Sequence, residues 1–402
     1  MTTSSGASSK FAGAVEPGPP LHRDRVERYS RQLLLPGFGE LAQRRLANAR
    51  VLVIGAGGLG SASIPYLASS GVGTIGVIDS DVVELSNLHR QVSHGIGDIG
   101  RSKVASIVDT VAAIDPQIVV VPHSVRLTAD NALSLFANYD VVLDGSDNFP
   151  TRYLTNDAAA LSAIPLVWGA IFRYSGQLGV AWAAQGPNYR DLFPVPPAPD
   201  QATSCAVGGV LPSVCATIGA LMSAEAIKVI TGVGEPLVGR VNSFDAITGR
   251  FRELRYGPSP DALPITGLID YQQFCGLPSG ESSPELVRAE NSGHSAATPT
   301  VNVQRLAERM AANETLQLID VREPAEADIA RITGAELIPL GTLVDAIEQI
   351  RTDVPVIIHC HHDGRAHSAA ARLRERGLHN IEVLEGGIDA YAALVDHTLA
   401  RY

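Results

Sequence analysis

The sequence predicts an α/β protein of two folded parts, each with a mostly parallel sheet covered by helices. Short apolar runs of strand length alternate with helical stretches along residues 22–275. A segment rich in Ser, Glu, Gly and Pro, without apolar periodicity, then spans residues 278–299 and is predicted to be a linker. Beyond it, residues 300–402 contain a second, shorter strand–helix alternation.

The elements can be assigned in order from the N-terminus. Residues 1–21 are rich in Ser, Gly and Pro, and we expect a disordered tail there. Arg and Gln spaced among Leu and Tyr predict a helix over residues 22–35, and a turn at residues 36–39 leads to a second helix ending near residue 46. Strands are predicted at residues 51–54, 74–79, 118–122, 141–144, 316–321, 356–360 and 381–384, and helices from the first strand to about residue 70 and over residues 212–230 and 367–376.

The composition excludes several classes of protein. Lys and Arg total 31 against 42 Asp and Glu, a net charge of −11, so the chain lacks the basic field that nucleic acid or anionic lipid would require. Prolines and polar residues interrupt the most apolar stretches, residues 158–172 and 208–230, which favours buried elements over membrane spans. The 4 Cys form no C-x-x-C pair. We therefore expect a cytoplasmic protein that binds neither nucleic acid nor membrane.

A glycine-rich turn follows the first predicted strand. Gly55, Gly57 and Gly60 satisfy the pattern G-x-G-x-x-G, and Gly58 adds a fourth glycine. Such a turn lets backbone N–H groups approach phosphate oxygens, with the dipole of the next helix behind them. Asp79, at the end of the second strand, is placed to hold ribose hydroxyls. Taken alone, the pattern also describes an NAD-binding unit, or glycines that only permit tight packing.

The residues after Asp79 favour a triphosphate over a dinucleotide. Asn87 and Arg90 come soon after the strand, and Lys103 is predicted in the next helix. A dinucleotide enzyme does not need so many phosphate donors, whereas a triphosphate attacked at its α-phosphorus needs its charge neutralised. Asp147 follows another strand and is placed to hold Mg²⁺, which proteins bind through one or two carboxylates plus substrate phosphates. Singly, these side chains are also explained as solvated charges or helix caps.

Residues 22–275 resemble the family of molybdopterin-synthase and thiamine-pathway adenylyltransferases, the bacterial relatives of ubiquitin-activating enzymes. The matching segments are residues 28–35, 55–60, 79–91 and 144–148, with Lys103. The resemblance implies a Rossmann-like adenylation domain over residues 22–277, in a homodimer. It would use ATP and Mg²⁺ to adenylate the C-terminal glycine of a small ubiquitin-like sulfur-carrier protein that ends in Gly-Gly.

The same resemblance implies roles for individual residues. The roles are ribose binding for Asp79, phosphate binding for Asn87, Arg90 and Lys103, magnesium binding for Asp147, and contact with a neighbouring subunit's ATP for Arg31. Arg90 and Lys103 would also be catalytic, because they would neutralise the charge that develops at the phosphates.

The chain departs from this family in its cysteines. The family commonly has two C-x-x-C pairs that hold structural zinc, but residues 188–191 contain no Cys and only Cys275 remains at the second place. One thiol cannot build a tetrahedral site, so we expect no zinc and a region held by packing alone. Cys205 precedes the helix predicted over residues 212–230. In some relatives a cysteine in this loop is linked to the carrier and in others it is dispensable, so a chemical role and a small buried residue both stay open.

A single cysteine is the main candidate in the second part. Cys360 ends an apolar strand and begins a short loop into the helix at residues 367–376. A helix N-terminus and Arg365 both lower a thiol pKa, so we predict a thiolate that carries an extra sulfur as a persulfide. The alternatives are an inert buried cysteine and a metal site with His361 and His362, whose adjacent side chains diverge.

Residues 300–402 resemble the rhodanese family. The matching segments are residues 318–324, 334–339 and 385–391. The family's active loop runs C-x-x-G-x-R, and here Arg365 keeps its offset from Cys360 while Asp363 occupies the usual glycine position and Gly364 stands one place late. The resemblance implies a small α/β rhodanese domain that takes sulfur from a donor such as thiosulfate or a cysteine desulfurase.

These predictions combine into one hypothesis. The first domain would activate the carrier terminus by adenylation. Cys360, assisted by Arg365, would then convert that terminus to a thiocarboxylate, with Cys205 as the resolving thiol. The linker would let the persulfide travel between the sites. Two alternatives stay open: an NAD-dependent oxidoreductase fused to a rhodanese module, and a catalytically silent carrier-binding scaffold. The carrier is not identified, so its pathway (molybdenum cofactor, thiamine, cysteine or a specialised metabolite) is open too.

Overall fold

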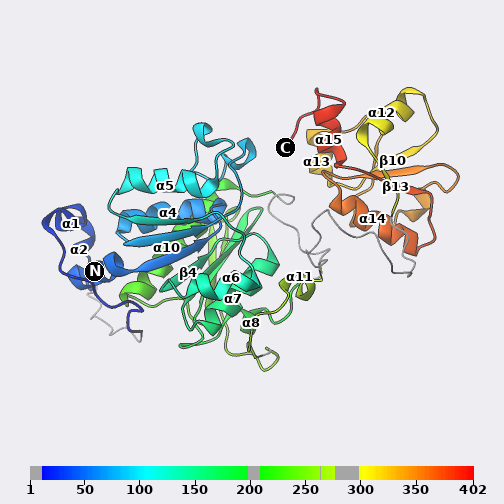
Figure 1. Ribbon diagram of the computed structural model, residues 1–402. Coiled ribbons are helices and arrows are strands. Elements are labelled where there is room, and N and C mark those ends of the chain that lie inside the picture. The colour runs from blue at the N-terminus through cyan, green and yellow to red at the C-terminus, as the bar shows by residue number, and fades with distance from the viewer. Residues whose placement is uncertain (1–10, 198–208, 263, 277–297) are drawn as a thin grey trace. The chain divides into compact units, whose positions relative to one another are not determined.

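A computed structural model describes residues 11–197, 209–262, 264–276 and 298–402. The chain divides into two units, residues 1–283 and 284–402, which are described separately (Figure 1).

The first unit contains one large sheet. Its strands are β1 Arg50–Ile54, β2 Thr74–Ile78, β3 Val119–His123, β4 Val141–Asp144, β5 Leu166–Phe172, β6 Ser175–Ala181, β7 Arg240–Asp245 and β8 Arg250–Arg255. They are ordered β3-β2-β1-β4-β5-β6-β7-β8. The strands from β3 to β5 in this order pair in parallel, and β6, β7 and β8 continue the sheet antiparallel. The predicted mostly parallel sheet is confirmed, and the predicted strands of this unit match β1 to β4 within one residue at each end.

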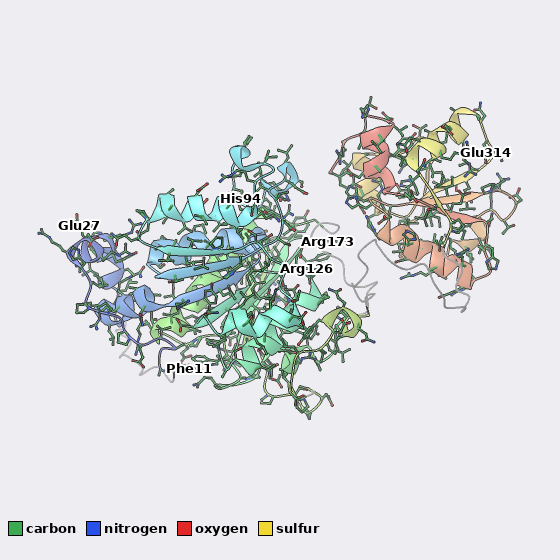
Figure 2. The ribbon with its side chains drawn as sticks, viewed as in Figure 1. Phe11, Glu27, His94, Arg126, Arg173 and Glu314 are labelled. Carbon is green, nitrogen blue, oxygen red and sulfur yellow. The ribbon has the colours of Figure 1, made fainter. Side chains whose placement is uncertain are left out.

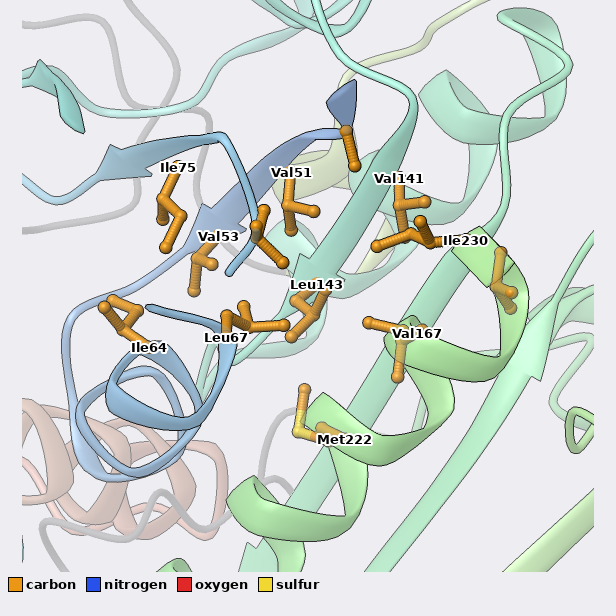
Figure 3. Close-up of a cluster of buried hydrophobic side chains, with 14 of the residues drawn as sticks. Val51, Val53, Ile64, Leu67, Ile75, Val141, Leu143, Val167, Met222 and Ile230 are labelled. Carbon is orange, nitrogen blue, oxygen red and sulfur yellow. The ribbon is translucent and has the colours of Figure 1, made fainter. Parts of the chain in front are cut away.

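Helices cover both faces of this sheet. They are α1 Arg23–Arg28, α2 Ser30–Leu33, α3 Gly39–Asn48, α4 Gly58–Ser70, η1 Leu85–Asn87, η2 Ile96–Asp98, α5 Lys103–Ile114, α6 Ala129–Phe136, α7 Phe149–Leu161, α8 Tyr189–Leu192, α10 Pro212–Thr231 and α11 Tyr271–Phe274. Because side chains alternate along a strand, Val51 and Val53 of β1 join one apolar cluster while Leu52 and Ile54 join another. The first cluster, under α3, α4, α5 and α10, is shown in Figure 3, and the second lies under α6, α7, α8 and α11.

The predicted helix over residues 22–35 is two short helices that meet at Tyr29. The Tyr29 hydroxyl lies 3.1 Å from a carboxylate oxygen of Asp115, and Arg25 donates to the same oxygen at 2.6 Å. Both Tyr29 and Asp115 are buried. A distant carboxylate, which no local pattern reveals, therefore fixes the break.

The predicted disordered tail is wrong for residues 11–21. The Ala14 N–H donates to the Val229 carbonyl at 2.8 Å, and Gly18 exchanges hydrogen bonds with Arg44 through its N–H and its carbonyl. Val15 is buried in the core. Residues 1–10 lie outside the described residues.

Helix α10 is the one described helix long and apolar enough to cross a membrane by length and composition alone. In the structure it packs against α4, β5 and β6, and 61% of its most apolar window is buried. Its apolar character is thus explained by its place in the core, as predicted.

A buried ion pair, and not packing alone, holds the region that lacks the two C-x-x-C pairs. Arg190 of α8 donates two hydrogen bonds to Asp157 of α7 at 2.7 and 2.6 Å, and the Tyr271 hydroxyl of α11 donates to the same carboxylate at 2.7 Å. The Arg190 guanidinium lies over the ring of Phe274, 4.6 Å from its centroid. The expectation of packing alone is therefore wrong, because α8 and α11 both bind one buried carboxylate of α7. The absence of zinc stays a prediction.

The second unit is a smaller, fully parallel sheet. Its strands are β9 Thr300–Val301, β10 Gln317–Asp320, β11 Glu336–Leu337, β12 Val356–His359 and β13 Ile381–Leu384, and its helices are α12 Val303–Ala311, α13 Pro324–Ile329, η3 Ile347–Gln349, α14 Gly364–Glu375 and α15 Gly387–Leu394. The strands are ordered β11-β10-β12-β13-β9. Helix α14 packs on one face, and α12 and α15 pack on the other. The predicted strands match β10, β12 and β13.

Candidate functional site

The glycine turn lies where the strand order of the large sheet reverses. Strand β1 pairs with β2 on one side and β4 on the other, and ligands of such sheets bind at the crevice that this reversal opens. Gly55 has a φ of 86°, and a Cβ on Gly60 would lie 1.8 Å from the Gly55 carbonyl oxygen, so the turn itself requires both glycines. A Cβ on Gly57 would meet only Gln91, at 3.8 Å. Close approach of a ligand is therefore the remaining reason for a glycine at position 57.

The Asp79 carboxylate is held in place by backbone hydrogen bonds, one of them from the glycine turn. One carboxylate oxygen accepts from the Ala56 N–H at 2.8 Å, and the other accepts from the Asp81 N–H at 2.8 Å. These bonds fix the carboxylate beside the glycine turn and leave it further acceptor capacity. The geometry fits the predicted contact with ribose hydroxyls.

The three predicted phosphate-binding residues lie on the segment after β2 and on α5. Asn87 is buried, and its side chain accepts from the Glu84 N–H at 3.2 Å. Arg90 donates to the Ser86 carbonyl at 2.9 Å. Lys103 is the first residue of α5, and its Nζ lies 2.9 Å from a carboxylate oxygen of Asp81.

The predicted magnesium ligand, Asp147, is exposed in the loop between β4 and α7. Asn148, not Asp147, caps α7, because its side chain accepts from the Thr151 N–H at 2.9 Å. A carboxylate that neither caps a helix nor forms an ion pair among the described residues suits a metal bound together with substrate phosphates. The predicted intersubunit residue, Arg31, is exposed on α2.

Two polar side chains at this site were not predicted. The side-chain oxygens of Gln91 and Ser146 are buried and have no hydrogen-bond partner in the described parts of the chain. Gln91 faces Gly57, and Ser146 follows β4 beside Gly55. Buried polar atoms are usually paired, so these two mark a place that a polar ligand would complete. Their only signal in the sequence is that they lie inside two of the matching segments, residues 79–91 and 144–148.

The sulfur loop, residues 360–365, is held from the opposite side by α15. The Cys360 and His361 carbonyls accept from the Ile388 and Asp389 N–H groups, each at 3.0 Å. A Cβ on Gly387, whose φ is 57°, would lie 2.1 Å from the His362 carbonyl oxygen, so only glycine allows this approach. Backbone N–H groups of His362, Arg365 and Ala366 are directed at the Cys360 sulfur.

The prediction of a lowered Cys360 pKa is wrong for this structure. Cys360 is only 2% exposed, and burial raises its pKa above the ordinary value although Ala366, Arg365 and His362 N–H groups and the Arg365 charge act against the rise. The Arg365 charge is shared between the thiol and a carboxylate, because its guanidinium donates two hydrogen bonds of 2.7 Å to Glu326 of α13. This carboxylate partner, which comes from another helix, offsets the charge that the sequence assigned to the thiol.

The shifted glycine of the loop is not required by the backbone. Asp363 occupies the N-cap position of α14, and Gly364 is its first residue, where a Cβ would meet nothing within 4 Å. The His361 ring makes tilted contacts with the rings of His362 and Tyr402, whose centroids lie 4.2 and 4.4 Å from its own. Among the described residues no group of three His, Cys, Asp or Glu side chains is arranged to hold a metal ion.

The other candidate cysteine, Cys205, lies outside the described residues. Cys215 is buried at the start of α10, and a Cβ on Gly58 would lie 3.0 Å from its sulfur. This agrees with a packing role for Cys215.

Comparison with known proteins identifies both units. Residues 29–264 match the ThiF family, and residues 302–394 match the rhodanese-like domain. The chain is 44% identical over 401 residues to "Probable adenylyltransferase/sulfurtransferase MoeZ" of Mycobacterium tuberculosis, covering 98% of this chain and 100% of the relative. It is 38% identical over 400 residues to "Adenylyltransferase and sulfurtransferase MOCS3" of Drosophila virilis, covering 95% of this chain and 86% of the relative.

Solved structures support the fold of the first unit. The crystal structure of E. coli MccB with ATP covers 60% of this chain and 73% of its own, with a TM-score of 0.51 and 22% identity. Another structure, the crystal structure of E. coli MccB, gives a TM-score of 0.52 over 66% of this chain and 75% of its own, with 20% identity. The chain belongs to the ThiF family, carries a C-terminal rhodanese-like domain, and is an enzyme of the adenylyltransferase/sulfurtransferase type.

Proposed function

We propose that the protein converts the C-terminal glycine of a ubiquitin-like sulfur-carrier protein into a thiocarboxylate. The observation that carries this proposal is the presence, in one chain, of two strand–turn–helix sites of different kinds. One is an open glycine turn near Lys103, with unpartnered polar atoms beside it, and the other is a closed loop around the Cys360 thiol. Adenylation needs the first, and sulfur transfer needs the second.

In the first step, a carrier carboxylate oxygen attacks the α-phosphorus of ATP, and the bond to pyrophosphate breaks. Asp79 holds the ribose, Asn87 donates hydrogen bonds to the phosphates, and Arg90 and Lys103 neutralise the phosphates as charge develops. Asp147 would hold Mg²⁺ together with those phosphates, and the ion would supply further charge neutralisation. The products are an acyl-adenylate and pyrophosphate.

In the second step, the Cys360 thiolate first takes a sulfur atom from thiosulfate, with sulfite as the leaving group, or from a cysteine desulfurase persulfide. The terminal sulfur attacks the acyl carbon, AMP leaves, and an acyl disulfide joins the carrier to Cys360. A second thiol then attacks the Cys360 sulfur, the S–S bond breaks, and the carrier thiocarboxylate is released. We assign this thiol to Cys205, with an external dithiol reducing the resulting disulfide.

The exposed surface of the N-terminal helices supports a homodimer. Leu34 is 74% exposed and Leu35 is 53% exposed, directly after α2, and Leu41 of α3 is 54% exposed. Arg31 lies on the same exposed segment, so a second copy that covers it would bring Arg31 to another ATP site. Light scattering tests the dimer. Mixing the Arg31→Ala and Lys103→Ala variants tests the shared site, because one intact site per mixed dimer restores activity that neither variant has alone.

The remaining assignments belong to the same proposal. We place the enzyme in the cytoplasm, with an adenylation domain over residues 22–277, a linker over residues 278–299 and no zinc. Metal analysis that found one zinc per chain would contradict the last assignment.

One experiment tests the whole reaction. The enzyme is mixed with candidate carriers, Mg·ATP and thiosulfate, and the mass of the intact carrier is measured for replacement of one oxygen by sulfur. Carrier-dependent exchange between ATP and pyrophosphate supports the adenylation step. Reduction of NAD without such exchange supports an oxidoreductase instead, and an unchanged thiocarboxylate yield from Cys360→Ala supports a scaffold or a sulfur route that avoids Cys360.

A further inference from the structure

His94 is a buried polar residue that the proposed reaction does not use. It follows the segment that carries Asn87 and Arg90, and Figure 2 labels it near α5. Its Nδ1 lies 2.8 Å from the Ser106 hydroxyl, and its Nε2 lies 3.2 Å from the Ala56 carbonyl oxygen. Because a carbonyl can only accept, Nε2 donates to Ala56, and the unprotonated Nδ1 of the neutral ring faces the Ser106 hydroxyl, which also bonds the Asp98 carboxylate. Both ring nitrogens of a neutral imidazole are therefore engaged.

The contact with Ala56 orients the peptide group between Ala56 and Gly57. In a trans peptide the carbonyl and the following N–H point in opposite directions, and the described residues contain no cis peptide bond. Holding the Ala56 carbonyl toward His94, in the interior, directs the Gly57 N–H away from the interior. The Ala56 N–H is itself bound by Asp79 at 2.8 Å. The residue before Gly57 is thus fixed by a carboxylate on one side and an imidazole on the other.

The contact with Ser106 reaches the helix that presents Lys103. Ser106 lies three residues after Lys103 on α5, which places the two residues on neighbouring positions of one helix face. Ser93, the residue before His94, is bound to Ser61 of α4 by two hydrogen bonds of 2.7 and 2.6 Å. The segment that ends at His94 therefore joins α4, which begins at the glycine turn, to α5, whose first residue is Lys103.

The charged surroundings agree with a neutral imidazole. Burial lowers the pKa of His94 below its ordinary value, and Lys103 acts in the same direction, while the bond to Ala56 and the charges of Asp98 and Asp79 oppose the shift. The neutral form is the one that can donate from Nε2 and accept at Nδ1 at the same time.

We propose that His94 is a positioning residue for nucleotide binding, which sets the orientation of the Ala56–Gly57 peptide and joins the glycine turn to the Lys103 turn of α5. It does not touch the reacting atoms. The inference rests on the proposed function for the identity of the ligand, Mg·ATP.

The test is the dissociation constant of Mg·ATP for matched variants of the full chain. We expect His94→Phe, which removes both hydrogen bonds at similar volume, to bind Mg·ATP about ten-fold more weakly. His94→Gln, whose amide can still donate to the Ala56 carbonyl, should recover most of the affinity. Ser106→Ala, a small change that removes only the second contact, should weaken binding roughly three-fold.

Gln43→Leu is the control for a purely structural effect. Gln43 is fully buried and donates to the Ser70 carbonyl at 2.9 Å, so it is a polar bridge at the opposite end of α4. We expect it to lower the thermal midpoint without changing the affinity for Mg·ATP. If His94→Phe and Ser106→Ala also leave the affinity unchanged, the positioning role is refuted. If the unaltered protein does not bind Mg·ATP, it is the proposed function that fails.

Discussion

The two candidate sites follow the same local path of the chain but differ in the group that the turn faces. At each, a parallel strand ends, a short turn follows and a helix begins: β1 to α4 at Gly55–Gly57, and β12 to α14 at Cys360. The glycine turn leaves buried oxygens of Gln91 and Ser146 without partners among the described residues. The sulfur loop instead surrounds a thiol that belongs to the chain. One strand–turn–helix geometry thus borders partnerless polar atoms in one unit and surrounds a thiol in the other.

Glycine has a different task in each turn. Gly60 lets α4 approach the turn that precedes it, whereas Gly387 lets α15 approach the sulfur loop from a distant part of the sequence. The first is a local requirement of one turn, and the second is a tertiary contact. The following predictions test this difference, beginning with the largest expected effect.

Removal of the Cys360 thiol should abolish sulfur transfer without affecting adenylation. We expect Cys360→Ala to reduce sulfur transfer from thiosulfate by at least about 100-fold, because the nucleophile is lost. Carrier-dependent exchange between ATP and pyrophosphate should be unchanged, since that step needs only the glycine turn. A parallel loss of exchange would show that the two sites are coupled and would contradict the comparison.

A methyl group on either close-contact glycine should disable one site and spare the other. Gly60→Ala would place a Cβ 1.8 Å from the Gly55 oxygen, and Gly387→Ala would place one 2.1 Å from the His362 oxygen at a positive φ that itself costs about 1–3 kcal/mol. We expect loss of ATP binding from the first and loss of sulfur transfer from the second.

Gly364→Ala is the matched control for these variants. Its Cβ would meet nothing within 4 Å, and the residue begins a helix, so sulfur transfer should remain and stability should not fall. Loss of sulfur transfer in this control would mean that the loop responds to any added methyl group.

The sulfur loop should lose stability in acid because of the residue before Cys360. His359 is fully buried, and burial lowers its pKa from 6.5 to about 4. The imidazole stays neutral in the folded unit but protonates near pH 6.5 when unfolded. Its contribution is therefore present above pH 6.5 and is lost as the pH falls toward 4, by about 3 kcal/mol of unfolding free energy.

Hydrogen exchange of peptides from β12, measured between pH 6.5 and 4 and corrected for the intrinsic rate, can follow this loss. The His359→Leu variant should show a flatter pH dependence over the same range. An unchanged slope in that variant would assign the acid sensitivity to other groups.

The smallest expected effect concerns the charge shared between Arg365 and Glu326. Glu326→Gln removes the carboxylate that Arg365 binds, so the guanidinium charge should act more strongly on Cys360 and lower its pKa. We expect alkylation of Cys360 by iodoacetamide at pH 7 to become roughly three-fold faster. Glu323→Gln, at the N-cap of the same helix and without a bond to Arg365, should leave the rate unchanged. Unchanged alkylation rates in both variants would show that the Glu326 carboxylate does not affect the thiol pKa.

The sequence by itself determined the features that depend on neighbouring residues. Strands β1, β2, β4, β10, β12 and β13, the glycine turn and the position of Cys360 before a helix all follow from short apolar runs and from turn residues beside them. The local backbone path of both candidate sites was therefore predictable, as was the position of Asp79 beside the glycine turn.

Only the tertiary structure decided which charges meet. Glu326 and Arg365 are 39 residues apart, and Asp157 and Tyr271 are 114 residues apart. No local pattern assigns such partners, because a charged side chain in a sequence is equally compatible with solvent. For that reason the direction of the Cys360 pKa shift, the Arg190–Asp157–Tyr271 contacts and the place of His94 between the glycine turn and α5 required the folded chain.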